Sequence, residues 1–267
     1  MQIHTFRCFG EHADGGNSAL VIEDDRSSTE ARQAFARHHN VTCVWIDPCD
    51  EPGVAAVVDY FYPHMRSPLC LHATLAVGQQ LFLQLFSHHG RQQELAVMTA
   101  VRGQRLGLAA GDNGEVLVRL QVQDAPQLDV DPRLIQRLLA APELAPQTQA
   151  RVVSVGSPKL LVEVANTAAL YALQPDLAAI AAWGKDAGVN GLYVYCRCDD
   201  GTYEGRNFHH LDPALEDSAT GVAAGALTAM LGCGITLRQG RVVGSANLIR
   251  TRTDGPDILV GGRVQAG

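Results

Sequence analysis

Two apolar segments built from small residues constrain the fold of this chain more than any other feature. The first is ATLAVGQQLFLQLF, within residues 72–86, and the second is TGVAAGALTAML, within residues 218–232. A surface helix carries a polar face, whereas a helix that is apolar all round must be covered on every side. The sequence therefore predicts two central helices, each wrapped by other elements.

The surroundings of these two helices are also repeated. Phe61 and Phe208 each precede a polar loop, and the loops end in the triplets HAT (72–74) and SAT (218–220), which are 146 positions apart. Each triplet opens a small-residue helix. Repetition at a fixed offset indicates an internal duplication, so we expect two halves of similar fold.

Periodicity and turn residues predict an α/β (α+β) chain of two pseudo-symmetric halves, residues 1–125 and 126–267. Each half is expected to be a barrel-like mixed sheet around its central helix. Residues 125–147 are punctuated by proline and are expected to form the bridge between halves. Further helices are expected at 28–39, 132–140 and 175–187, and strands at 1–9, 19–23, 41–47, 54–63, 116–122, 156–164, 191–197 and 201–209.

Composition excludes several classes of protein. The chain has 267 residues, of which 46% are hydrophobic and 18% charged, and a net charge of −7, which is typical of a globular protein with a large core. Without a Lys/Arg cluster, nucleic acid is not an expected partner. Without an apolar run of about 18 residues or a signal peptide, neither a membrane nor an export route is expected. The predicted location is the cytoplasm.

The seven cysteines are irregularly spaced at positions 8, 43, 49, 70, 196, 198 and 233. No CxxC pair occurs, so neither a disulfide framework nor a zinc site is expected. Cys70 and His72 are two positions apart but have no second ligand pair nearby. We therefore expect buried, reduced thiols and no bound metal.

The starts of the two central helices carry the candidate chemistry. If both point into a cleft between the halves, they present unpaired backbone N–H groups and positive dipole ends to a small carboxylate or an enolate. The loop before the first helix brings Cys70 and His72, and the loop before the second brings Glu216 and Asp217. An imidazole facing a carboxylate is a plausible acid/base pair.

Simpler roles are also open at these positions. Asp217 or Ser218 could serve only as a helix N-cap, the commonest use of such residues. His72 could be a histidine satisfied within a first helical turn. Other catalytic motifs are absent: the chain has no P-loop and no GxSxG, and GVAAGA follows a loop where a dinucleotide fingerprint would follow a strand.

At these motifs the chain resembles the PhzF-like family of phenazine-biosynthesis isomerases, which shares the fold of diaminopimelate epimerase. LCLHATLA is similar to the family's Cys-Gly-His-Ala-Thr motif, with Leu71 in place of glycine. EDSATGVAAGAL is similar to its Glu-Asp-Pro-Ala-Thr-Gly-Ser-Ala motif. GGNSALVI, GSPKLLVEV and RQGRVVGSAN resemble further family segments, so the resemblance covers nearly the whole chain.

The resemblance implies a cofactor-independent isomerase, often homodimeric and biosynthetic, that moves a proton on a small unsaturated carboxylic acid. It places the family's acid/base histidine at His72 and its aspartate at Asp217. Substrate contacts are expected from the motif residues Asn17, Cys70, Ala73, Thr74, Glu216, Ser218, Thr220 and Gly221.

One departure affects the expected chemistry. The family carries a proton-carrying glutamate on the strand after the first helix, and here that strand reads VTCVWIDP. The glutamate position falls on Thr42 or Cys43, and neither side chain is a carboxylate. A thiol of ordinary pKa, about 8.5, is a poor base near neutral pH.

Three functions are therefore weighed. The first is a PhzF-like isomerase with an altered acid/base set, in which His72 and Asp217 exchange the proton and Thr42 or Cys43 orients the substrate. The second is an epimerase that uses Cys70, which lacks a second thiol at the other helix start. The third is a binding protein that has kept the fold and lost the chemistry.

Overall fold

The computed structural model describes residues 1–12, 15–89, 94–208 and 216–267. Two compact units are formed, one by residues 1–119 with 261–267 and the other by residues 120–260. The predicted boundary at 125–126 lies close to residues 119–120, where the chain passes from the first unit to the second. Residues 261–267 were predicted to belong to the second half, but they belong to the first unit. The reason is that the end of strand β16 (Asp257–Ala266) pairs with the first strand of the chain.

The first unit is a closed eight-stranded barrel. Its strands run in the order β1-β2-β3-β4-β6-β7-β8-β16, and pairing of β16 with β1 closes the ring. The short strand β5 pairs with β4 at the edge. The bounds are β1 Gln2–Cys8, β2 Asn17–Glu23, β3 Thr42–Asp47, β4 Ala56–Phe61, β5 Arg66–Ser67, β6 Glu94–Thr99, β7 Arg105–Ala110 and β8 Glu115–Gln121; the 3₁₀ turn η1 spans Asp112–Gly114.

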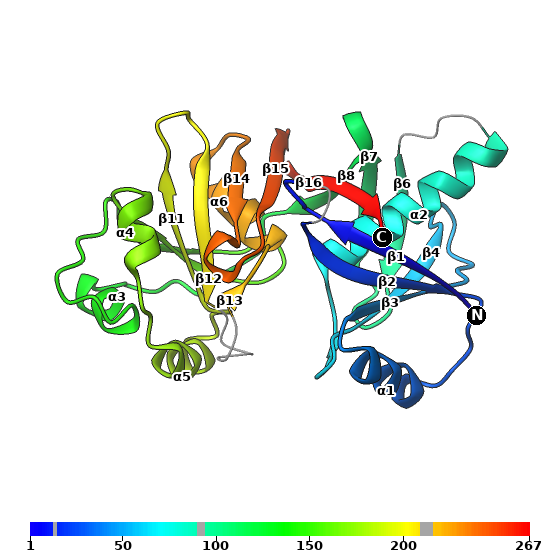
Figure 1. The fold of residues 1–267 in the computed structure, drawn as a ribbon, viewed down its shortest axis with the longest axis horizontal. Helices are drawn as coiled ribbons and strands as arrows, with labels where there is room; N and C mark the ends of the chain where they lie inside the picture. The colour runs from blue at the N-terminus through cyan, green and yellow to red at the C-terminus, as the bar shows by residue number, and fades with distance from the viewer. Residues whose placement is uncertain (13–14, 90–93, 209–215) are drawn as a thin grey trace. The chain divides into compact units, whose positions relative to one another are not determined.

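Helix α2 (Leu71–His89) is the central helix of this barrel (Figure 1). It contacts β1, β2, β3 and β7, and every side chain from Ala73 to Val77 is buried. Gly78 lies against β8, since a Cβ at this position would stand 2.7 Å from Cγ1 of Val116. The all-round apolar pattern thus predicted a surrounded helix correctly.

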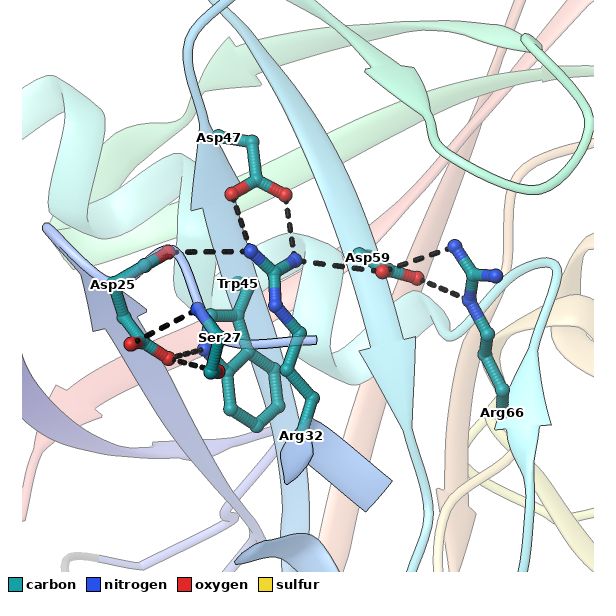
Figure 2. Close-up of polar contacts among 7 residues, drawn as sticks. All are labelled: Asp25, Ser27, Arg32, Trp45, Asp47, Asp59 and Arg66. Atoms are coloured by element: carbon teal, nitrogen blue, oxygen red, sulfur yellow. Dashed lines mark hydrogen bonds and ion pairs between the residues drawn. The ribbon is translucent and has the colours of Figure 1, made fainter. Parts of the chain in front are cut away.

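Helix α1 (Thr29–His39) covers the outer side of β3 and β4, where it is held by an ion-pair network. Figure 2 shows Arg32 of α1 between two carboxylates, with its Nη atoms 2.6 and 2.7 Å from Asp47 and 3.5 Å from Asp59. Arg66 of β5 makes a bidentate contact with Asp59 at 2.8 and 3.0 Å. The network therefore joins α1 to three strands on the side away from α2.

The second unit repeats this plan. Its strands run in the order β16-β15-β14-β12-β11-β10-β9, with β13 paired to β12. The central helix α6 contacts β9, β10 and β15. The strands are β9 Arg151–Val153, β10 Lys159–Glu163, β11 Leu192–Arg197, β12 Tyr203–Phe208, β13 Glu216–Asp217, β14 Thr236–Gln239 and β15 Asn247–Asp254; the helices are α3 Pro132–Leu138, α4 Thr167–Ala172, α5 Leu177–Ala187 and α6 Gly221–Leu231, with a 3₁₀ turn η2 Arg241–Val243.

The duplication is confirmed in topology but not in register. Both units contain a parallel pair, an antiparallel pair and a second parallel pair, namely β2–β3, β3–β4 and β4–β6 against β10–β11, β11–β12 and β12–β14. Helix α2 begins at Leu71 and α6 at Gly221, 150 positions later. The offset of 146 was therefore wrong near the helix starts, because the triplets HAT and SAT are not structurally equivalent.

Two smaller expectations are corrected by packing. The segment 125–147 is not a free bridge: Val130, Ile135 and Leu138 belong to the hydrophobic core of the second unit. All seven cysteines are free, as expected, but Cys49 and Cys198 are half-buried and Cys233 is exposed. No helix in the described part of the chain has the length and hydropathy needed to cross a membrane.

Candidate active site

The start of α2 is fixed by Thr74. Its backbone N–H and its hydroxyl both donate to the carbonyl of Cys70, at 2.9 and 2.8 Å. The hydroxyl also lies 2.6 Å from that of Tyr60 on β4, and Thr74 is fully buried. Thr74, predicted as a substrate contact, therefore has its hydroxyl engaged in joining the helix to the barrel. Ala73, in the same turn, is also fully buried.

Cys70 and His72 lie together at this helix start. The Cys70 thiol is 3.4 Å from Nδ1 of His72, and it accepts a hydrogen bond of 3.3 Å from the Tyr62 hydroxyl. Cys70 is only 2% exposed, whereas His72 is half-buried. The imidazole is therefore the more accessible of the two acid/base groups in the first unit.

The two candidates for the glutamate position lie on opposite faces of β3. Cys43 packs with Trp45 and Phe61 in the cluster that α1 covers, and its thiol donates to the Val41 carbonyl at 3.5 Å. Burial raises the pKa of Cys43 to about 12. The side chain of Thr42 points to the other face of β3, because side chains alternate along a strand.

Tyr60 identifies the face on which Thr42 lies. Tyr60 pairs with Val44 and reaches Thr74 of α2, so Val44 and Thr42 share the face that α2 covers. Asn17, the remaining predicted contact in this unit, is the first residue of β2 and pairs with Cys8.

In the second unit, Asp217 belongs to a hydrogen-bonded group at the start of α6. Its carboxylate accepts from the Thr220 hydroxyl at 2.6 Å, and its carbonyl accepts from the Gln239 amide at 2.7 Å. Gln239 also donates to the Thr220 hydroxyl at 2.9 Å and accepts from the Tyr193 hydroxyl at 3.0 Å. These contacts hold the carboxylate beside the helix start.

Neither Asp217 nor Ser218 is the N-cap of α6. That position is held by Thr220, whose side chain makes no capping bond. Ser218 instead presents its carbonyl to the Asn247 amide at 2.8 Å. Among the residues that the structure describes, no acceptor is found for the backbone N–H groups of Gly221 and Val222, as is usual for the first turn of a helix.

Glu216 has a structural partner. Its carboxylate makes a bidentate ion pair with Arg206, at 3.0 and 2.7 Å, and both side chains are largely buried. Arg206 also donates to the carbonyls of Leu170 and Leu173 at 2.9 and 3.0 Å. Glu216, predicted to contact substrate, therefore ties β13 to β12 and to the region of α4.

Three buried polar residues of this unit were not predicted from the sequence. Lys159 is 1% exposed at the start of β10, Asn207 is fully buried on β12, and Gln239 is 1% exposed on β14. A lysine directly before the apolar run LLVEV was a visible signal. No group of three or more His, Cys, Asp or Glu side chains suited to a metal ion occurs among the described residues.

Comparison with known proteins agrees with this architecture. The family model described as phenazine biosynthesis-like protein matches residues 6–246. The chain belongs to the phenazine biosynthesis-like family. The uncharacterized isomerase YddE of Escherichia coli (strain K12) is 26% identical to this member over 86% of the chain and 78% of YddE.

Solved structures show that the family member has an epimerase-like fold. A predicted epimerase from Pseudomonas aeruginosa matches with a TM-score of 0.80 and 23% identity, over 99% of this chain and 96% of that one. A hydroxyproline epimerase from Agrobacterium vitis matches with a TM-score of 0.62 and 12% identity, over 100% and 90%. The predicted fold class is confirmed.

Proposed function

We propose that the protein is a cofactor-independent isomerase that moves a proton, and with it a double bond, on a small unsaturated carboxylic acid. The proposal is supported mainly by the acid/base groups at the two helix starts. His72 is half-buried beside Cys70, and Asp217 is oriented by Thr220 and Gln239. Family membership supports the reaction class.

In this proposal His72 and Asp217 exchange the substrate proton. The substrate carboxylate, or the enolate formed when a proton leaves, is stabilised by backbone N–H groups at the helix starts. Thr42 orients the substrate through its hydroxyl, and Cys43 has no direct part because it lies under α1. The proposal includes a homodimer in the cytoplasm.

The epimerase hypothesis is less well supported. With the repeat at an offset of 150, the counterpart of Cys70 is Thr220, which hydrogen-bonds to Asp217. An epimerase with two thiols places one at each helix start, and here the second position holds a hydroxyl. Activity that persists in Cys70→Ala would exclude the thiol as a base.

Hydrogen exchange tests the proposed function directly. A panel of β,γ-unsaturated carboxylic acids is incubated with the protein in D₂O, and deuterium incorporation and double-bond migration are followed by NMR. We expect His72→Asn and Asp217→Asn each to lower the rate by about 10²- to 10⁴-fold, the usual contribution of a general acid or base.

Cys43→Ser is the control, because Cys43 lies on the opposite face of β3 from Thr42, and its rate should match that of the wild type. Exchange that is equally fast in the wild type and in both variants would rule out these roles. Saturable binding of the acids without any exchange would indicate a binding protein.

A further inference from the structure

A polar cluster inside the second unit is not explained by its fold. We propose that Lys159 and Asn207, on the α6-facing side of the sheet, bind the carboxylate group of the ligand. This inference rests on the proposed function and deepens it, since it names side chains that hold the substrate while His72 and Asp217 act on it.

Lys159 is a buried cation without a close counter-ion. It is 1% exposed, and its ammonium donates to the Asn190 carbonyl at 2.5 Å. Within the described part of the chain, no carboxylate lies within ion-pair distance of it. Burial lowers the pKa of Lys159 to about 8, and the charge of Asp217 opposes this fall. An ammonium has three donors, so this one can still bind an anion.

Asn207 is an amide buried without partners. It is 0% exposed, and among the residues described neither its Oδ1 nor its Nδ2 has a hydrogen-bond partner. Buried polar groups in folded proteins are almost always hydrogen-bonded. Tyr171, Asn190 and Asn247 of this unit each have one buried polar atom without a partner, whereas in Asn207 both polar atoms lack one. An amide left in this state indicates that a partner is supplied from outside the chain.

The strand register shows which way Asn207 faces. Asn207 pairs with Tyr193 on one side and Asp217 on the other. The Tyr193 hydroxyl reaches Gln239, which binds Thr220 at the start of α6. The neighbouring residue Phe208 lies in the opposite core, under α3 and α5. Asn207 therefore faces α6.

Lys159 shares this face. Its neighbour Leu160 lies in the same opposite core as Phe208, and side chains alternate along a strand. The α6-facing side thus carries an ammonium, an amide N–H₂ and, at the helix start, the two backbone N–H groups of Gly221 and Val222. All four are donors.

This donor set fits a carboxylate. A carboxylate accepts several hydrogen bonds through two oxygens and is bound more strongly by charged donors. A single buried lysine balances one negative charge, and Asp217 close by would repel a group carrying two. A carboxylate is therefore favoured over a phosphate.

The test measures binding of crotonate, with uncharged crotonamide as the matched probe, by calorimetry and NMR. The proteins are the wild type, Lys159→Met, Asn207→Leu and the control Lys185→Met, each checked for folding by circular dichroism. We expect Lys159→Met and Asn207→Leu to weaken crotonate binding about tenfold or more, the effect of losing a hydrogen bond to a charged group. Lys185→Met, on an exposed lysine, should retain it.

Several outcomes would overturn the inference. One is the absence of saturable crotonate binding, and another is an affinity for crotonate that is unchanged in both variants. A third is that both variants lose crotonamide binding as much as crotonate binding. A fourth is a crystal structure with crotonate that shows only water between Lys159 and Asn207. The proposed function is tested by a different measurement. If crotonate binds through Lys159 but no acid in the panel exchanges hydrogen, the carboxylate site is supported and the isomerase activity is excluded.

Discussion

Lys159 shows how one residue can oppose folding and still be retained. Its ammonium lies in the interior with one carbonyl as its hydrogen-bond partner. Desolvation of a charge costs free energy unless the charge is paired. A bound carboxylate would offset that cost by pairing with the ammonium. The burial of Lys159 is therefore better explained by a ligand site than by packing of the core.

This cost predicts a pH dependence of stability. Burial lowers the pKa of Lys159 from its ordinary 10.5 to about 8 in the folded protein. Between these values Lys159 binds more protons in the unfolded chain, so its contribution to the free energy of unfolding rises with pH, by on the order of 3 kcal/mol in total. Burial raises the pKa of Cys43 to about 12, and this acts in the opposite direction above the ordinary pKa of a thiol. The contribution of Lys159 is therefore measured as the difference between the wild type and a variant without the lysine.

Urea denaturation of the wild type and of Lys159→Met at several pH values between about 8 and 10.5 measures this contribution. The stability of the wild type relative to Lys159→Met should rise with pH across the window, because methionine has no proton to lose. Lys185→Met is the control, and its stability relative to the wild type should not change with pH, since Lys185 is exposed. A difference between the wild type and Lys159→Met that stays constant across the window would contradict the prediction.

Arg206 connects elements that the chain order keeps apart. It lies on β12, pairs with Glu216 of β13 and donates to the carbonyls of Leu170 and Leu173 around the end of α4. The arrangement positions Asp217, which follows Glu216, at the start of α6. The ion pair of Glu216 thus helps to hold the segment that leads to the start of α6.

Removal of Arg206 should be strongly destabilising. Arg206→Ala leaves the buried Glu216 carboxylate unpaired, and breaking a buried pair in this way costs about 3–5 kcal/mol. The double variant Arg206→Met/Glu216→Leu should recover part of the loss, because both charges are gone. Both are measured by urea denaturation.

Arg238→Ala is the matched control, since its pair with Asp200 is partly exposed. It should cost less than about 1 kcal/mol. Equal costs for Arg206→Ala and Arg238→Ala would contradict the structural role assigned to the buried pair.

The first unit depends on both ends of the chain. Residues Val264 to Ala266 pair with Cys8 to Phe6 and close the barrel. A chain that ends at Val260 should lose this closure and expose the edges of β1 and β8, which favours aggregation. Residues 120–260 should remain folded, because they form a compact unit of their own.

Hydrogen exchange measured by mass spectrometry tests this truncation. Protection should fall across β1, β2 and β8 and persist in β10 and β11. Removal of Gly267 alone is the control. It loses one hydrogen bond, from the Gly267 N–H to the Thr5 carbonyl, but it should preserve most of the protection because Val264 to Ala266 still pair with β1. A truncated protein with unchanged protection in β1 would show that β16 is not needed for closure.

The sequence by itself determined the two central helices and the family, because apolar segments and the short motifs at the helix starts are local signals. It also predicted His72 and Asp217 as the acid/base residues, a prediction that the hydrogen-exchange experiment tests. It did not determine that Cys43 lies under α1 while Thr42 faces α2, that Glu216 is bound to Arg206, or that the repeat has an offset of 150. Strand pairing decides which way a side chain points, and that pairing joins residues far apart in the chain. For the same reason, only the tertiary structure showed that Lys159 and Asn207 share the face beside α6.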